Sequence, residues 1–141
     1  MSDVLAAVAI PQLERLADII DARSRNAATL NNLLCDQDGL KIPEVPMNRR
    51  HVWHQYTLLL ENVDRHLVAS RLATAGIESG VYYSRIAWDH DVYRRHPRVV
   101  QDPAPVADRI AAVCPSIPVH HKLTVEEIRA VAAETRRAVA A

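Results

Sequence analysis

The first candidates for metal binding or proton transfer in this 141-residue sequence are its seven histidines. His51 and His54 are three residues apart in a segment of strand-like composition, so their side chains are expected on opposite faces and cannot bind one ion together. His90 lies between Asp89 and Asp91, which leaves open a small metal hydrolase, although this spacing matches no zinc motif. We therefore expect no metal site.

Two lysines and two cysteines are the other candidates for covalent chemistry. A lysine that forms a Schiff base needs a desolvated pocket that lowers its pKa. Lys41 follows Gly39 in a turn-rich connection and Lys122 comes just before a helix start, so we expect both to be solvated. Cys35 and Cys114 are far apart and form no CxxC pair, and we expect two buried free thiols.

Composition narrows the class of protein. The 17 basic and 17 acidic residues give a formal net charge of zero, which argues against nucleic acid or an anionic membrane as the main partner. Hydrophobic residues make up 49%, enough for one folded core. No stretch resembles a leader peptide or reaches the roughly 18 apolar residues of a membrane span, so we expect a cytoplasmic protein.

The periodicity of apolar residues predicts the first half of the chain. Residues 2–34 are expected to form one long helix that Ser2 caps, with a kink near residues 7–10 because Pro11 removes a backbone donor. Residues 51–60 predict the best strand in the chain. Asp64 is expected to cap a short helix that Gly76 ends, and residues 77–83 predict a second strand.

The second half begins with a long loop, residues 84–101, which is expected to be functional because of its length. Asp102 and Pro103 are expected to open a helix. Residues 114–119 predict a short edge strand, because Pro115 and Pro118 interrupt it. Thr124 and Glu127 form a capping box before a last helix.

This order predicts an α/β (α+β) fold, in which helices cover a small, mostly antiparallel sheet and a long N-terminal helix leads into it. We divide the chain into a linking helix over residues 1–38 and a small domain over residues 39–141.

Four segments, in order, resemble the C-terminal small domain of the DegT/DnrJ/StrS sugar aminotransferases. The residues that carry the resemblance are Met1-Ser2, Ala6-Ala7, Gln12-Leu13, Arg23 and Arg25 in the first helix; HVWHQYTLLL over residues 51–60; Gly76-Ile77 and Gly80-Val81-Tyr82-Tyr83; and Ser116-Ile117-Pro118, Leu123-Thr124 and Glu126-Glu127. The resemblance covers nearly the whole chain.

The resemblance implies the small domain of a fold-type I aminotransferase, which moves an amino group to a keto group of a nucleotide-linked sugar by means of pyridoxal phosphate. It also implies that the lysine and the phosphate site for this cofactor belong to a preceding large domain, so we expect this chain alone to bind no cofactor and to be inactive. A large domain on another chain is then an expected partner. The alternative is a non-enzymatic protein-interaction module.

Substrate-binding residues are also implied by the resemblance. Tyr82, Tyr83, Arg85 and Trp88 lie at a strand end and loop that face the cofactor domain in the family, so they are our candidates for contacts with the sugar or its diphosphate. Ser84 and Trp88 replace a proline and a histidine that the family often has there. We also expect a homodimer through the first helix, because its early apolar residues have no obvious cover.

Overall fold

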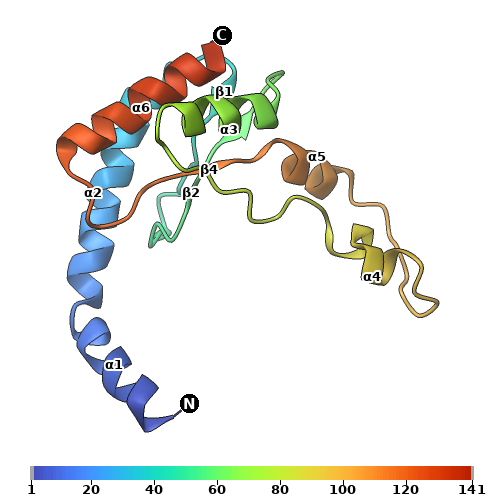
Figure 1. Cartoon of the computed structure of the whole chain (residues 1–141), viewed down its shortest axis with the longest axis horizontal. Helices are drawn as coiled ribbons and strands as arrows, with labels where there is room; N and C mark the ends of the chain where they lie inside the picture. Colours follow the sequence, from blue (N-terminus) through green and yellow to red (C-terminus); the bar gives the residue numbers. More distant parts are fainter. Residues whose placement is uncertain (1, 141) are drawn as a thin grey trace.

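Two arms project from a helical core in the computed structural model, which describes residues 2–140 (Figure 1). One arm is α1 (Asp3–Glu14), and the other carries α4 (Asp91–Arg94) and α5 (Pro105–Val113). The helices of the core are α2 (Leu16–Leu34), α3 (Arg65–Thr74) and α6 (Val125–Ala140). The short elements in the described range are β1 (Leu40–Lys41), β2 (Tyr56–Thr57), β3 (Leu59–Leu60), η1 (Ala87–Asp89) and β4 (Ser116–Ile117).

The N-terminal helical region is interrupted at Arg15, which separates α1 from α2 with φ −93° and ψ 1°. The expectation of a kink at residues 7–10 stays a prediction, but Pro11 does not end the helix, because α1 continues through it. Proline removes one backbone donor from a helix, and here the helical path is lost four residues later. Ser2 caps α1 as predicted, since its hydroxyl accepts from the Leu5 amide at 3.5 Å.

Two small antiparallel sheets form the strand layer. β1 pairs with β3, with Leu40 opposite Leu60, and β2 pairs with β4, with Thr57 opposite Ser116. The two sheets are joined through Leu58, whose amide donates to the Pro115 carbonyl at 2.9 Å.

The predicted strand over residues 51–60 is correct only at its end. Residues 51–55 turn instead, because Trp53 adopts φ 51° and its amide donates to Nδ1 of His51 at 2.9 Å. A left-handed residue of this kind breaks the alternation of a strand.

The prediction of an edge strand at residues 114–119 is also wrong. Ser116 pairs with Thr57 on one side. On the other side it forms a bridge with Gly80, in which the Gly80 amide donates to the Ser116 carbonyl at 2.9 Å and the Ser116 amide donates to the Gly80 carbonyl at 2.7 Å. Pro115 and Pro118 flank the paired residues, so their missing amides interrupt neither pairing. The predicted strand over residues 77–83 is reduced to this bridge.

Apolar side chains from α2, α3, α6 and the strands form one core. α6 packs against both α2 and α3, and Arg136 fastens it by donating to the Leu33 carbonyl at 2.9 Å and the Asp36 carboxylate at 2.5 Å. Arg71 of α3 donates to the Ala138 carbonyl at 2.8 Å. The largest fully buried side chains include Tyr56, Leu30, Leu34, Leu58, Leu72 and Ile128.

Helix boundaries follow local chemistry. Asp64 caps α3 by accepting from the His66 amide at 2.8 Å, and Gly76 follows that helix with φ +78°. The capping box before α6 is formed, with Thr124 and Glu127 bonded in both directions. α5 begins at Pro105, so the expected start at Pro103 is wrong by two residues.

The predicted fold class, a small antiparallel sheet covered by helices with a long helical entry, is therefore confirmed. The division at residue 38 stays a prediction, although the second half of α2 belongs to the same core as the rest. None of the helices within residues 2–140 is long and apolar enough to cross a bilayer.

Candidate functional site

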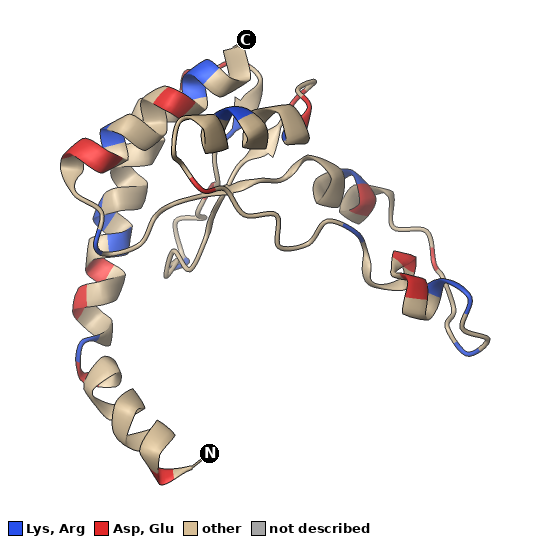
Figure 2. Ribbon diagram, viewed as in Figure 1, with Lys and Arg blue, Asp and Glu red and all other residues tan. Residues whose placement is uncertain are grey.

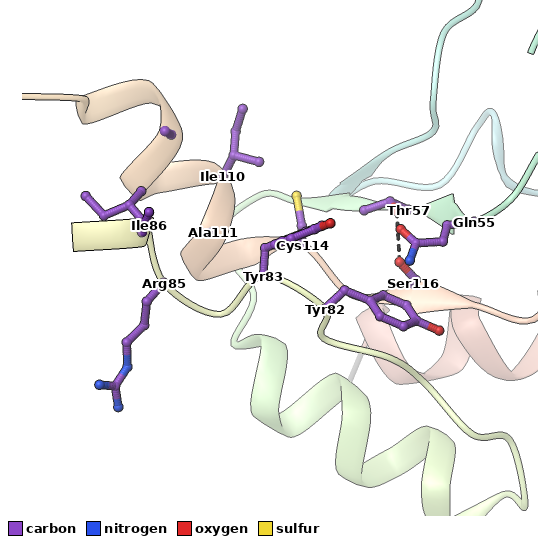
Figure 3. A pocket seen from close by; sticks show the side chains of 12 residues that line it. Gln55, Thr57, Tyr82, Tyr83, Arg85, Ile86, Ile110, Ala111, Cys114 and Ser116 are labelled. Atoms are coloured by element: carbon purple, nitrogen blue, oxygen red, sulfur yellow. Dashed lines mark hydrogen bonds between the residues drawn. The ribbon is translucent and has the colours of Figure 1, made fainter. Parts of the chain in front are cut away.

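An apolar cleft of about 420 Å³ lies between the 82–87 segment and α5, and we call it the tyrosine cleft (Figure 3). The chain brings its walls together from four separate regions: the start of β2, the segment after Gly80, α5 and β4. Its lining residues are Gln55, Thr57, Tyr82, Tyr83, Arg85, Ile86, Ala87, Ala107, Ile110, Ala111, Cys114 and Ser116.

Polar groups of the tyrosine cleft lie on the β2 and β4 side. The hydroxyls of Thr57 and Ser116 are 2.8 Å apart and bonded to each other, and the amide of Gln55 lies beside them in Figure 3. The wall formed by Ile110 and Cys114 is apolar, and burial raises the pKa of the Cys114 thiol. The cleft therefore suits a ligand with one apolar face and a polar edge.

Arg65 fixes the root of the arm that forms one wall of this cleft. Its guanidinium is buried, and Nη1 donates to the Ala111 carbonyl near the end of α5. The Cys114 amide then closes α5 on the Ile110 carbonyl. These contacts attach α5 to the core, whereas much of its apolar side stays exposed, including Val106 at 61% and Ile110 at 42%.

The structure brings together three of the four predicted site residues. Tyr82, Tyr83 and Arg85 line the tyrosine cleft, but Trp88 lies in η1 and is not among its walls. In Figure 3 the rings of the two tyrosines point in different directions, although both side chains line the same cleft. The guanidinium of Arg85 points away from the other side chains.

Gly80 gives Tyr82 its position. A Cβ atom on Gly80 would lie 2.6 Å from Cε2 of the Tyr82 ring, so the ring occupies the space that any other residue would fill. Tyr82, Gln55 and Ser116 also line a second cleft, of about 380 Å³, which we call the arginine cleft. That cleft is lined by Arg23, His54, Gln55, Glu78, Gly80, Tyr82, Ser116, Ile117, Pro118, Val119 and His120.

Sequence reasoning missed several of these residues. Gln55, Ile110 and Cys114 reach the tyrosine cleft from positions up to 59 residues apart in the chain. The spacing of apolar residues along α5 indicated which side of the helix is apolar. It did not indicate whether that side packs against the core or lines a cleft. Cys35 was expected to be buried and is exposed, since it lies at the end of α2.

The described residues do not fit pyridoxal phosphate. Lys41 pairs with Glu61 at 2.5 Å and its side chain is 63% exposed, and Lys122 is exposed in the turn before α6. Within residues 2–140, no lysine lines either cleft. No group of three or more metal-binding side chains occurs in the same range, and Asp89 and Asp91 contact Arg94 instead.

An aminotransferase family matches the chain over nearly its whole length. Residues 1–136 match the model of the DegT/DnrJ/EryC1/StrS aminotransferase family, and the chain belongs to that family. Membership implies pyridoxal phosphate as the cofactor of a complete enzyme of this kind, and it confirms the resemblance found in the sequence.

Individual relatives agree with this assignment. The chain is 29% identical over 137 residues to the UDP-N-acetyl-3-dehydro-α-D-glucosamine 3-aminotransferase of Acidithiobacillus ferrooxidans, covering 97% of this chain and 36% of that protein. It is 30% identical over 130 residues to the UDP-2-acetamido-2-deoxy-3-oxo-D-glucuronate aminotransferase of Pseudomonas aeruginosa, covering 91% of this chain and 34% of that protein.

A solved structure gives the same result for the fold. A DegT/DnrJ/EryC1/StrS aminotransferase from Brucella abortus superposes with a TM-score of 0.83 at 29% identity, covering 96% of this chain and 35% of that one. The chain therefore spans about a third of the length of the relatives it matches.

Proposed function

We propose that this chain is the C-terminal part of a pyridoxal-phosphate aminotransferase that acts on nucleotide-linked keto sugars in amino-sugar biosynthesis. The observation that carries the proposal is the family match over residues 1–136, together with relatives whose names specify UDP-linked 3-keto sugars. A cofactor-bearing large domain, on the same or another chain, is part of this proposal. So are the inactivity of residues 1–141 alone and a cytoplasmic location.

The role of this chain in the reaction is to bind and orient the sugar nucleotide. The exposed face of Tyr83 and the apolar side of α5 offer a surface to the nonpolar face of a ring. Gln55, which carries both a donor and an acceptor, and the bonded hydroxyls of Thr57 and Ser116 would then meet the polar edge of the ligand. Such contacts hold the keto carbon in a fixed place while the large domain supplies the chemistry.

A chimeric enzyme tests the proposal. The matching segment of the A. ferrooxidans relative is replaced by residues 1–141, and the purified chimera is mixed with glutamate and UDP-N-acetyl-3-dehydro-glucosamine. We expect an aminated sugar nucleotide, detected by mass spectrometry, because the exchanged segments are 29% identical over 137 residues and make up 36% of that protein. Residues 1–141 by themselves are expected to give no product.

The cofactor absorbance of the chimera is the control for folding. A chimera that binds pyridoxal phosphate and is reduced by borohydride on the lysine of its large domain, yet aminates none of a panel of UDP- and dTDP-linked keto sugars, would contradict the proposed function. A product formed by residues 1–141 alone would contradict the proposal that the large domain supplies the chemistry.

A further inference from the structure

The helix α5 has few attachments to the rest of the protein, although it forms one wall of the tyrosine cleft. None of its residues is buried, and its contact with the apolar core is made by Val113, at its end. The tyrosine cleft lies on one side of α5, and a further cleft of about 580 Å³ is lined by Arg109 and Val113 of α5 and by residues 59–64. The position of α5 therefore depends on what holds its last turn.

The last turn of α5 is capped by a residue of another helix. The Ala111 carbonyl would ordinarily accept from the amide four residues later, but that residue is Pro115, which has none. Nη1 of Arg65 donates to this carbonyl instead. The last turn of α5 has no basic residue of its own, and Figure 2 shows the end of α5 nearer the core without charged residues. A cation is favourable there, because the carbonyl end of a helix carries partial negative charge.

Arg65 is poorly placed for the stability of its own helix. It is the first residue of α3, where the helix dipole disfavours a cation. It is only 8% exposed and forms no ion pair with a carboxylate within residues 2–140, and burying an unpaired charge costs free energy. The neighbouring Asp64 carboxylate accepts from the His66 amide. The contact with α5 is therefore what accounts for an arginine at this position.

The guanidinium of Arg65 lies directly behind the wall of the tyrosine cleft. Ala111, whose carbonyl it binds, lines the cleft, and so does Cys114. Burial raises the pKa of the Cys114 thiol, and the nearby positive charge of Arg65 lowers it. Arg65 itself is not among the residues that line the cleft. It consequently acts on the wall without being available to a ligand.

We propose that Arg65 is a positioning residue for the tyrosine cleft, which holds α5 at the distance from β2 and β4 that a bound ring requires. Without the guanidinium, the Ala111 carbonyl loses its partner, and the wall formed by Ala107, Ile110 and Ala111 is free to shift into the space on either side of α5. The role of Arg65 in binding a sugar nucleotide rests on the proposed function, whereas its attachment of α5 does not.

The first experiment measures amide hydrogen exchange along the 141-residue chain by NMR. Arg65→Met keeps an unbranched apolar side chain but has no donor, and we expect exchange of the α5 amides to become about tenfold faster, because the hydrogen bond of a charged donor is lost. Arg71→Met is the matched control, since Arg71 is also in α3 and donates to a carbonyl near the end of another helix, Ala138 of α6. It should speed exchange at the end of α6 and leave α5 unchanged.

The second experiment measures steady-state kinetics in the active chimera. We expect Arg65→Met to raise the KM for the sugar nucleotide by about tenfold with a much smaller change in kcat, because a displaced wall weakens binding of the ligand and does not touch the reacting atoms. Arg65→Lys keeps the charge and a donor but not the planar fork, so it should recover part of the KM. Arg71→Met should leave the KM unchanged.

Two results would overturn the proposal. One is equal exchange of the α5 amides in Arg65→Met and the unchanged chain, and the other is faster exchange of α5 with an unchanged KM. Circular dichroism establishes that each variant is folded. If Arg65→Met is unfolded, the same comparison is made between Arg65→Lys and Arg71→Lys. A chimera that aminates no sugar nucleotide would contradict the proposed function instead, and the exchange measurement would still decide whether Arg65 positions α5.

Discussion

Tyr83 is the single residue on which the proposed sugar site depends most. It lines the tyrosine cleft and is 81% exposed, so a ligand can cover its ring. In the active chimera we expect Tyr83→Phe to raise the KM for the sugar nucleotide by a few-fold up to about tenfold, the value of one neutral hydrogen bond. Tyr83→Ala should raise it further, since the ring surface is lost as well.

Tyr93→Phe is the control for this measurement, because Tyr93 belongs to α4 and lies outside both clefts. Equal KM values for Tyr83→Phe, Tyr83→Ala and the unchanged chimera would contradict the site. Arg85→Ala should have a smaller effect than Tyr83→Ala, since the guanidinium of Arg85 points out of the cleft.

Individual residues of the site were predictable where the sequence kept them together. Tyr82, Tyr83 and Arg85 lie within four positions, and the family resemblance indicated them as a group. Gln55 and Ile110 could not be predicted, because their place in the cleft results from the pairing of β2 with β4 and from the position of α5. Such long-range pairing leaves no local signal in a single sequence.

At the level of single elements, the start of α6 provides a test that depends on pH. The Glu127 carboxylate accepts from the Thr124 amide at 2.7 Å, while the Thr124 hydroxyl accepts from the Glu127 amide at 3.2 Å. The hydrogen bonds from the Thr124 backbone and side chain lower the pKa of Glu127 below its ordinary value of 4.5. The folded pKa is thus below the unfolded one, so the stabilisation is present above pH 4.5 and is lost as the pH falls through the folded pKa.

We therefore expect Glu127→Gln to lower the thermal midpoint of the chain at pH 7 and to make little difference at pH 3. Thermal unfolding followed by circular dichroism at both values measures this. Glu126→Gln is matched to it, because Glu126 is also in the first turn of α6 but has no such hydrogen bond. If the two variants lose the same stability at pH 7, only the charge at the helix start matters.

Elements were predicted well where local chemistry determines them and poorly where tertiary contacts do. The caps of α1, α3 and α6 follow from Ser2, Asp64 and Thr124, whose side chains act on their own turn. The strand prediction failed at residues 51–55, because the left-handed Trp53 depends on a contact with His51. β4 was taken for an edge strand, because nothing in its own sequence indicates the bridge from Ser116 to Gly80.

At the scale of the whole molecule, the main unfavourable feature is the apolar surface that α1 exposes to solvent. No residue of α1 is buried, and its large apolar side chains are spread around the helix instead of forming one stripe. A helix that is apolar on all sides is normally enclosed by protein. The exposed apolar residues of this arm are Val4, Leu5, Val8, Ile10 and Leu13.

We expect the isolated 141-residue chain to self-associate through α1, because each such side chain gains about 1.5–3 kcal/mol on burial. Sedimentation at about micromolar concentration should detect a dimer, and Leu5→Asp with Val8→Asp should dissociate it. Leu67→Asp with Val125→Asp is the matched control, since these two residues are exposed on the core at 45% and 57%. A monomer in the unchanged chain would contradict the prediction.

Because the helix is interrupted at Arg15, α1 acts as a rigid arm that can rotate about that residue. With 12 residues, the helix is about 18 Å long at 1.5 Å per residue. A change of about 10° in direction at Arg15 would therefore move the far end by about 3 Å, the size of one hydrogen bond. Since α1 has few contacts with the core, whatever covers its apolar surface decides that angle, and the joint converts a small rotation into a displacement that is large on the scale of a binding site.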